Sequence, residues 1–317
     1  MLKLLRRLAA LALCLLLPLT AAPADTVTAL DGSGTLLETL PMDDYAAFGR
    51  YVDPEDMGDD GYSDASIQVS VSHEWIDGTR YNVARVRVAH ASQLRTALYK
   101  DNVRKAGYVW TNAADHNAVV AIGGECLSWN DGVYTVRMSQ TLRTHGIRSR
   151  DTLIIDQNGD FHITKGFSKD TITQLEEQGL QIVNLFNFGP ALVIDGEAVY
   201  DLCRGRKYPV GPVSGYHPRT AIGQLGPLEY LLVVADGRNV KITEADGTTR
   251  KSQGINVYTL GEYMAAQGCV QAYTLDGGGS AVMYYGKTGT YSQPCSKRGV
   301  TDIIYFASLS PVQETAE

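Results

Sequence analysis

The sequence predicts an α+β fold in which mixed, largely antiparallel β-sheets and a few flanking helices form a single compact domain. Apolar segments of strand length are joined by turns typical of hairpins, and helical spacing is confined to a few segments. Glycine contributes 32 of the 317 residues, which is above the roughly 7% that is usual and typical of a chain with many tight turns. Strand runs with hairpin joints favour mixed sheets over a doubly wound parallel sheet.

The first 24 residues are predicted to be a signal peptide. Three basic residues precede an apolar run at 8–19, and residues 22–24 (Ala-Pro-Ala) form a small-x-small cleavage pattern. Cleavage would leave Asp25 first and no stable membrane span, because no later apolar run approaches the roughly 18 residues that cross a bilayer. The protein is therefore expected to be secreted or located in the cell envelope. An uncleaved anchor is the alternative.

The mature chain is expected to begin with an acidic lead-in or linker over residues 25–65. Closely spaced aspartates and turn residues predict a solvated segment there, and their spacing lacks the regular pattern of a calcium loop. The folded domain is expected at 66–308 and a tail at 309–317.

Charge and cysteine content exclude several classes of protein. The formal net charge is −7, and losing the basic residues of the leader makes it about −10, so a nucleic-acid partner is not expected. Four cysteines remain after cleavage, without a CxxC pair, so a structural zinc site is not expected. Free thiols and one or two disulfides both stay open for Cys126, Cys203, Cys269 and Cys295.

Patterns in the first half of the domain alternate between strand and helix. Residues 67–71 alternate apolar and polar side chains, whereas the segment after Ser92 has apolar residues at helical spacing. The expected elements are a strand at 67–71, a strand at 84–88, a short helix at 93–98 capped by Ser92, a helix at 111–117 and a strand at 118–122.

The second half begins with a hairpin closed at Asn158-Gly159, a sequence typical of a tight turn. A helix that starts at Ser168 or Asp170 is expected to stop at Gly179. A later helix is expected to start at the capping-box pattern Thr259–Glu262 and to end at Gly268. The expected strands are 153–155, 161–163, 182–186, 191–194, 230–235 and 270–275.

Two acidic residues follow buried strands and open glycine-rich turns. Asp276 precedes three glycines and Ser280, and Glu125 follows Gly123-Gly124. Glycines at a strand end allow close backbone approach to a ligand, and their N–H groups can bind an anion. Two carboxylates at the ends of different strands are what acid–base or nucleophilic cleavage of a glycosidic bond requires. A flexible turn, or a cap made by either acid alone, is the structural alternative.

Arginine residues beside predicted strands are candidates for anion binding. Arg219 follows His217-Pro218, and proline fixes the entry to the strand. Arg137 and Arg298 also adjoin apolar strand residues. The planar guanidinium fork suits a phosphate or carboxylate, and a surface salt bridge is the ordinary alternative.

Four motifs in this order resemble the phosphodiester glycosidase family, which includes N-acetylglucosamine-1-phosphodiester α-N-acetylglucosaminidases and exported bacterial members associated with exopolysaccharide. The resemblance runs from about Tyr62 to about Phe306. The motifs are AIGGE at 121–125, FNFGPALVIDGE at 186–197, HPRTAIG at 217–223 and LDGGGSAVMYYGK at 275–287, followed by KRGVTDIIYF at 297–306.

The resemblance implies hydrolysis of the C1–O bond of a sugar-1-phosphodiester, in a phosphate-linked glycoconjugate or a cell-surface polymer, without a cofactor or metal. It implies Asp276 as nucleophile or base, Glu125 as its carboxylate partner and Arg219 as the phosphate clamp. Charge stabilisation by Arg219 and the glycine N–H groups is expected to matter more than a general acid, since a phosphate is a weakly basic leaving group. The expected substrate-binding residues are Gly124, Arg137, Gly189, Thr220, Gly277, Gly278, Gly279, Ser280 and Arg298.

One departure from the family pattern leaves alternatives open. Family members usually read AINGD where this chain has AIGGE at 121–125, so an asparagine is missing and the acid is one methylene longer. A methylene moves a carboxylate by more than catalysis usually tolerates. A catalytically impaired sugar-phosphate-binding protein of exopolysaccharide or cell-envelope metabolism is therefore the alternative. A metal-dependent phosphodiesterase would require a His and Asp cluster that the sequence does not show.

Overall fold

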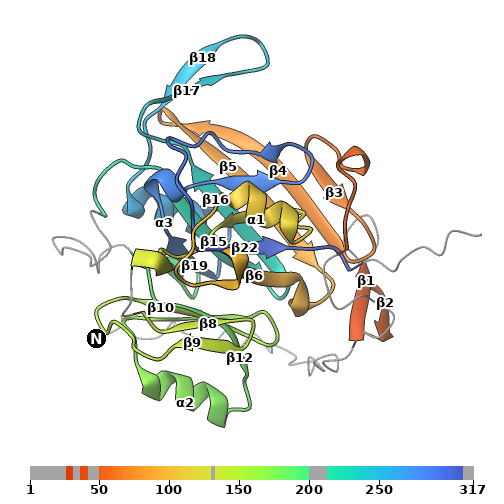
Figure 1. The fold of residues 1–317 in the computed structure, drawn as a ribbon, viewed down its shortest axis with the longest axis vertical. Coiled ribbons are helices and arrows are strands. Elements are labelled where there is room, and N and C mark those ends of the chain that lie inside the picture. The colour runs from red at the N-terminus through yellow and green to blue at the C-terminus, as the bar shows by residue number, and fades with distance from the viewer. Residues whose placement is uncertain (1–25, 31–35, 42–49, 130–132, 200–212, 310–317) are drawn as a thin grey trace, which may run out of the picture.

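The computed structural model describes residues 26–30, 36–41, 50–129, 133–199 and 213–309. The largest sheet in these residues is antiparallel and has eight strands (Figure 1). The strand order is β14-β13-β19-β15-β16-β5-β4-β3. Its strands are β3 (Gly61–Ser63), β4 (Ile67–Ile76), β5 (Thr79–Val88), β13 (Ala191–Ile194), β14 (Glu197–Ala198), β15 (Arg219–Gly226), β16 (Glu229–Ala235) and β19 (Gln271–Leu275).

Two five-stranded antiparallel sheets complete the framework, in the orders β11-β10-β12-β8-β9 and β21-β20-β7-β22-β6. Their strands are β6 (Leu94–Leu98), β7 (Val120–Gly123), β8 (Thr135–Arg137), β9 (Gln140–Arg143), β10 (Thr152–Asp156), β11 (Phe161–Thr164), β12 (Ile182–Phe186), β20 (Met283–Tyr285), β21 (Gly289–Thr290) and β22 (Asp302–Phe306). Two further hairpins pair β1 (Thr26–Leu30) with β2 (Leu36–Pro41) and β17 (Val240–Thr243) with β18 (Thr249–Ser252). The α-helices are α1 (Val109–Asp115), α2 (Lys169–Glu177) and α3 (Val257–Ala266). The predicted α+β class with largely antiparallel sheets is confirmed.

The main core lies where the three sheets meet. Strand alternation directs Ile67 and Val69 of β4 inward, where they join Ile122 of β7, Leu153 of β10 and Phe306 of β22. Each such side chain contributes roughly 1.5–3 kcal/mol when fully buried. Strands β15 and β19 contribute Ile222 and Tyr273 to the same core, so their positions are fixed by close packing.

Helix α3 covers part of the opposite face of the central sheet. Its residues Leu260 and Met264 are fully buried against Val83 and Val233 of the sheet. The helix begins after Asn256, whose side chain accepts from Thr259 N–H at 2.8 Å. The predicted start at Thr259 is therefore wrong, because Asn256 caps the helix one turn earlier. Gly268 follows the helix with φ +91°, as predicted.

The other element predictions have mixed outcomes. The hairpin of β10 and β11, and helix α2 capped by Ser168, are confirmed. The predicted helix at 93–98 is wrong: a 3₁₀ turn over 91–93 is capped by His90, and residues 94–98 form strand β6. Pairing with β22 outweighs the helical spacing of these residues, since strand preference depends on tertiary context.

Packed structure begins before residue 66, where the sequence placed the start of the domain. Met57 is only 4% exposed and belongs to the main core, and β3 pairs with β4. Arg50 forms a bridge to Ser308, and Leu309, assigned to the tail, is buried. Part of the predicted lead-in is thus integral to the fold.

Several predictions concern residues outside the described part of the chain. The signal peptide at 1–24, residues 310–317 of the tail and Cys203 lie there, so export stays a prediction. Cys269 and Cys295 are free thiols. Among the described residues, no helix has the length and apolar character needed to cross a membrane.

Candidate active site

A cleft of about 240 Å³ opens where β15 begins and β19 ends. The register pairs Thr220 with Leu275, so the next residues, Arg219 and Asp276, lie at the same end of two neighbouring strands. The cleft is lined by Phe188, Gly189, Pro190, Val213, His217, Arg219, Arg238, Val257, Thr274, Leu275, Asp276, Gly277, Gly278 and Arg298.

Asp276 is the acid that lines this cleft. Its carboxylate Oδ2 lies 3.1 Å from Nη2 of Arg298, and the Ser280 hydroxyl and Gly277 N–H also donate to it. Its side chain is 16% exposed. Burial raises its pKa above the ordinary value, against the opposing effect of Arg298. A carboxylate made more basic in this way is suited to accept a proton from water.

Two further neighbours hold Asp276 in position. Its backbone N–H donates to Gly124 O at 3.0 Å, which links β19 to the AIGGE segment. The Cys126 thiol donates to its carboxylate, and the pKa of Cys126 is raised to about 12, chiefly by burial. Cys126 is therefore protonated at neutral pH and acts as a hydrogen-bond donor. The sequence did not predict this contact.

The three glycines after Asp276 form a tight turn whose shape excludes side chains. A Cβ on Gly277 would lie 2.6 Å from Pro218 O, and Gly278 has φ +62°. The Gly278 N–H donates to Pro218 O at 2.9 Å and the Ser280 N–H to Gly277 O at 3.2 Å. Because these two N–H groups already donate to protein carbonyls, they do not bind an anion, and the role of the turn is to position Asp276. Most of the positive charge of the cleft comes from the arginines.

Three arginines approach the cleft from different segments. Arg219 donates through Nη2 to Gly215 O at 2.9 Å, and burial lowers its pKa to about 10, so it stays charged at neutral pH. Arg298 bridges Ser280 Oγ at 2.9 Å and Gly277 O at 2.6 Å. Arg238, which was not among the residues predicted from the sequence, follows β16 in a turn with φ +58°.

Glu125 and Arg137 lie together with Asp302 in a buried cluster. Arg137 Nη2 is 2.7 Å from Asp302 Oδ2 and 3.3 Å from Glu125 Oε2. The Glu125 N–H donates to Asp302 Oδ1 at 2.8 Å, and Arg137 also lies over the Phe186 ring. None of these three residues lines the cleft. Arg137, expected to bind substrate, is placed in a buried ion-pair network instead.

The cluster holds two acids and one cation, so one acid is expected to carry a proton. Asp302 receives the shorter contact from Arg137, at 2.7 Å, whereas Glu125 receives one at 3.3 Å and a hydrogen bond from the Asn187 N–H. Burial and Asp302 raise the pKa of Glu125 to about 7, although Arg137 opposes the rise. Glu125 is therefore the proton carrier near neutral pH.

We expect Glu125→Gln to change how stability depends on pH. Because the folded-state pKa of Glu125 is raised, the folded form holds its proton while the unfolded form releases it, so wild-type stability falls between about pH 4.5 and 7. The neutral glutamine removes this contribution. The difference in free energy of unfolding, Glu125→Gln minus wild type, should therefore rise by about 3 kcal/mol between pH 4.5 and 8. Urea unfolding at a series of pH values measures this difference. A constant difference across that range would contradict the assignment.

The remaining predicted site residues surround the cleft. Gly189, Gly277 and Gly278 line it, while Gly279 and Ser280 form the buried 3₁₀ turn (278–280) behind it. Thr220 is buried within β15, and a Cβ on Gly124 would lie 2.6 Å from the Asp302 carboxylate. These residues are therefore placed to shape the cleft from behind.

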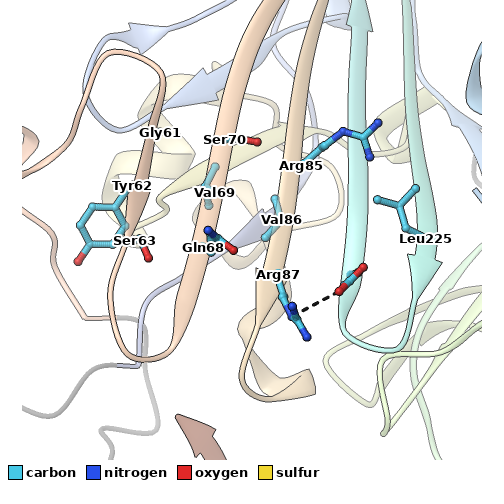
Figure 2. A pocket seen from close by; sticks show the side chains of 11 residues that line it. Gly61, Tyr62, Ser63, Gln68, Val69, Ser70, Arg85, Val86, Arg87 and Leu225 are labelled. Atoms are coloured by element: carbon cyan, nitrogen blue, oxygen red, sulfur yellow. Dashed lines mark ion pairs between the residues drawn. The ribbon is translucent and has the colours of Figure 1, made fainter. Parts of the chain in front are cut away.

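A larger hollow of about 510 Å³ lies on the central sheet, against β3, β4 and β5 (Figure 2). Arg85 and Arg87 extend over it, and its acid is Glu229, which pairs with Arg87 at 3.4 Å. This half-exposed ion pair is of the kind that contributes little energy. The hollow lacks the combination of buried acid and glycine turn found at Asp276, so the smaller cleft is the candidate active site.

A metal centre would need several ligating side chains close together. Within the described ranges, no group of three or more His, Cys, Asp or Glu residues is arranged to hold a metal ion.

Comparison with known proteins identifies relatives of the chain and its fold. The family profile for phosphodiester glycosidase matches residues 115–307. The catalytic domain of zebrafish N-acetylglucosamine-1-phosphodiester alpha-N-acetylglucosaminidase, auto-inhibited by its pro-peptide, is 16% identical with a TM-score of 0.57 over 82% of this chain and 87% of that one. A hypothetical protein from Synechocystis is 15% identical, with a TM-score of 0.53 over 77% and 62% of the two chains. At these identities the two structures show the fold.

Among curated proteins, the SPbeta prophage-derived uncharacterized protein YomE of Bacillus subtilis (strain 168) is 35% identical over 65 residues. That match spans 20% of this chain and only 8% of the relative.

Proposed function

This chain belongs to the phosphodiester glycosidase family, a family of hydrolases, and we propose that it cleaves the C1–O bond of a sugar-1-phosphodiester. The substrate would be a phosphate-linked glycoconjugate or a surface polymer. The observation that carries the proposal is the position of Asp276, a partly buried acid at a strand end, in a cleft with three arginines. Such a site combines a group that acts at the sugar carbon with cations that receive the phosphate.

We assign the chemical roles according to what lines the cleft. Asp276 acts as base or nucleophile at C1, and Arg298, 3.1 Å from it, holds the phosphate beside the reacting carbon. Arg219 clamps the same group from β15. Because the leaving phosphate is weakly basic, positioned cations stabilise the developing charge without a strong general acid. Glu125 contributes through the buried cluster that supports Gly124 and Asp276.

The direct test is release of free sugar by the purified wild-type protein. The substrates are methyl N-acetylglucosamine 1-phosphate and UDP-N-acetylglucosamine, with the corresponding glucose compounds in parallel. We expect saturable release of free sugar together with the intact phosphate-bearing product, because the C1–O bond breaks. Release of sugar 1-phosphate would instead mean cleavage at phosphorus and would contradict the assigned reaction.

A catalytically impaired sugar-phosphate-binding protein is the second candidate. The observation that favours it is the burial of Glu125, which is 2% exposed and paired with Arg137. The described lining of the cleft therefore contains one acid, whereas glycosidases normally use two. Calorimetric binding of the same substrates without sugar release would support this candidate over hydrolysis.

A further inference from the structure

The cleft around Asp276 carries more positive charge than one phosphodiester neutralises. Its described lining holds three arginines and one carboxylate: Arg219, Arg238, Arg298 and Asp276. Burial and the nearby Arg219 and Arg238 lower the pKa of His217, which keeps this residue neutral at neutral pH. The lining is thus positive by about two charges. A phosphodiester carries a single negative charge, whereas a diphosphate diester carries two, so the latter matches the site.

Two of the arginines lie beside neighbouring glycines of the turn after Asp276. Arg298 Nη2 lies 2.6 Å from Gly277 O, and a Cβ on Gly278 would lie 3.0 Å from Arg238 Nη2. The two guanidinium groups therefore lie beside successive residues of the same turn. Both cations thus border the one turn that follows Asp276, and both line the cleft.

Arg238 is held in place by a buried support. The preceding Asp236 pairs with Arg80 at 2.8 Å and accepts the Gln293 N–H at 2.9 Å. A Cβ on Gly237 would lie 2.7 Å from Pro218 N, which packs the turn against the entry to β15. The Arg238 side chain itself is exposed. A fixed backbone with an exposed guanidinium is a pre-organised arrangement for binding an anion.

The single acid of the cleft fits a phosphate leaving group with either one phosphoryl group or two. An ordinary glycoside needs a second carboxylate to protonate its leaving group, and Glu125 is enclosed with Arg137 and Asp302. A diphosphate leaves as a weakly basic anion whose charge the arginines can take up. Its departure therefore needs no proton from the protein.

We propose that, within the function proposed above, the cleft takes a sugar joined through C1 to a diphosphate. Arg219 and Arg298 hold the phosphoryl group next to the sugar, and Arg238 holds the second one. The C1–O bond breaks and the diphosphate keeps the electron pair, while water gives its hydroxyl to C1 and its proton, through Asp276, to solvent. This assignment rests on the proposed glycosidase reaction.

The test compares diphosphate and monophosphate substrates in wild type and Arg238→Ala. The probes are UDP-N-acetylglucosamine and methyl N-acetylglucosamine 1-phosphate, and the readout is the ratio of their kcat/KM values. Wild type should favour the diphosphate, and the variant should lower the ratio about 10- to 100-fold, as for loss of a charge-assisted hydrogen bond. Arg85→Ala, which removes an exposed arginine of the other hollow (Figure 2), should leave the ratio unchanged. An unchanged ratio in Arg238→Ala would overturn the proposal.

A binding measurement separates this inference from the proposed reaction. By calorimetry, inorganic pyrophosphate should bind more tightly than inorganic phosphate, and Arg238→Ala should weaken pyrophosphate binding tenfold or more. If this pattern appears but no substrate releases sugar, the reaction fails and the diphosphate site stands. If sugar is released but pyrophosphate binds no better than phosphate, the diphosphate site fails and the reaction stands.

Discussion

Asp276→Asn is expected to lower kcat for sugar release about 10²- to 10⁴-fold, the range associated with loss of a positioned base. Asparagine keeps the size of the side chain and can still contact Ser280 and Arg298, but it cannot accept the proton of water or attack C1. KM should change less than kcat, because the arginines that contact the phosphate remain. The measurement is initial-rate kinetics, with thermal melting to show that the variant is folded.

Glu125→Gln is the matched control, since it makes the same chemical change in the other acid of the two glycine-rich turns. Glu125 is enclosed with Arg137 and Asp302 and does not line the cleft, so this variant should keep kcat within about tenfold of wild type. A loss as large as that of Asp276→Asn would show that Glu125 acts in the reaction. Equal activity of Asp276→Asn and wild type would remove Asp276 from its assigned role.

The fold was predictable where local pattern and tertiary environment agree. The hairpin at Asn158-Gly159 and the helix capped by Ser168 follow from turn and cap residues that act locally. Strand β6 was not predictable in the same way, because Leu94, Ala97 and Leu98 also have helical spacing. Only the neighbouring strand β22, about two hundred residues later in the chain, determines that the segment is extended.

The candidate site was predictable where acids and glycines follow buried strands. Asp276 and Gly277 lie at the cleft as that pattern indicates. The burial of Glu125 could not be predicted from the same pattern, because its partner Asp302 is distant in sequence. Asp302 itself carried a signal, because an acid inside an apolar strand is almost always paired. Arg238 had a weaker one, as a cation in the Asp-Gly turn that follows an apolar strand.

The buried cluster provides the second large effect, on stability. Arg137→Met is expected to lower the free energy of unfolding at pH 7.5 by about 3–5 kcal/mol, because it leaves Glu125 and Asp302 buried without their cation. It also removes the donors to the carbonyls of Val136 and Leu185. Against a total of about 5–15 kcal/mol for a typical domain, this loss is large. Urea unfolding with linear extrapolation measures it.

The pH dependence and a compensating variant distinguish electrostatic loss from poor packing. The defect of Arg137→Met should shrink at pH 5, since without Arg137 the pKa values of both acids rise and the folded protein takes up protons that neutralise them. Adding Asp302→Asn and Glu125→Gln should restore much of the stability at pH 7.5, because buried ion clusters can be replaced by neutral groups with little loss. A cost that is the same at both pH values and in the triple variant would mean that Arg137 acts through its packing on Phe186 and its hydrogen bonds to the carbonyls of Val136 and Leu185. The charges of the cluster would then contribute little to holding Gly124 beneath Asp276.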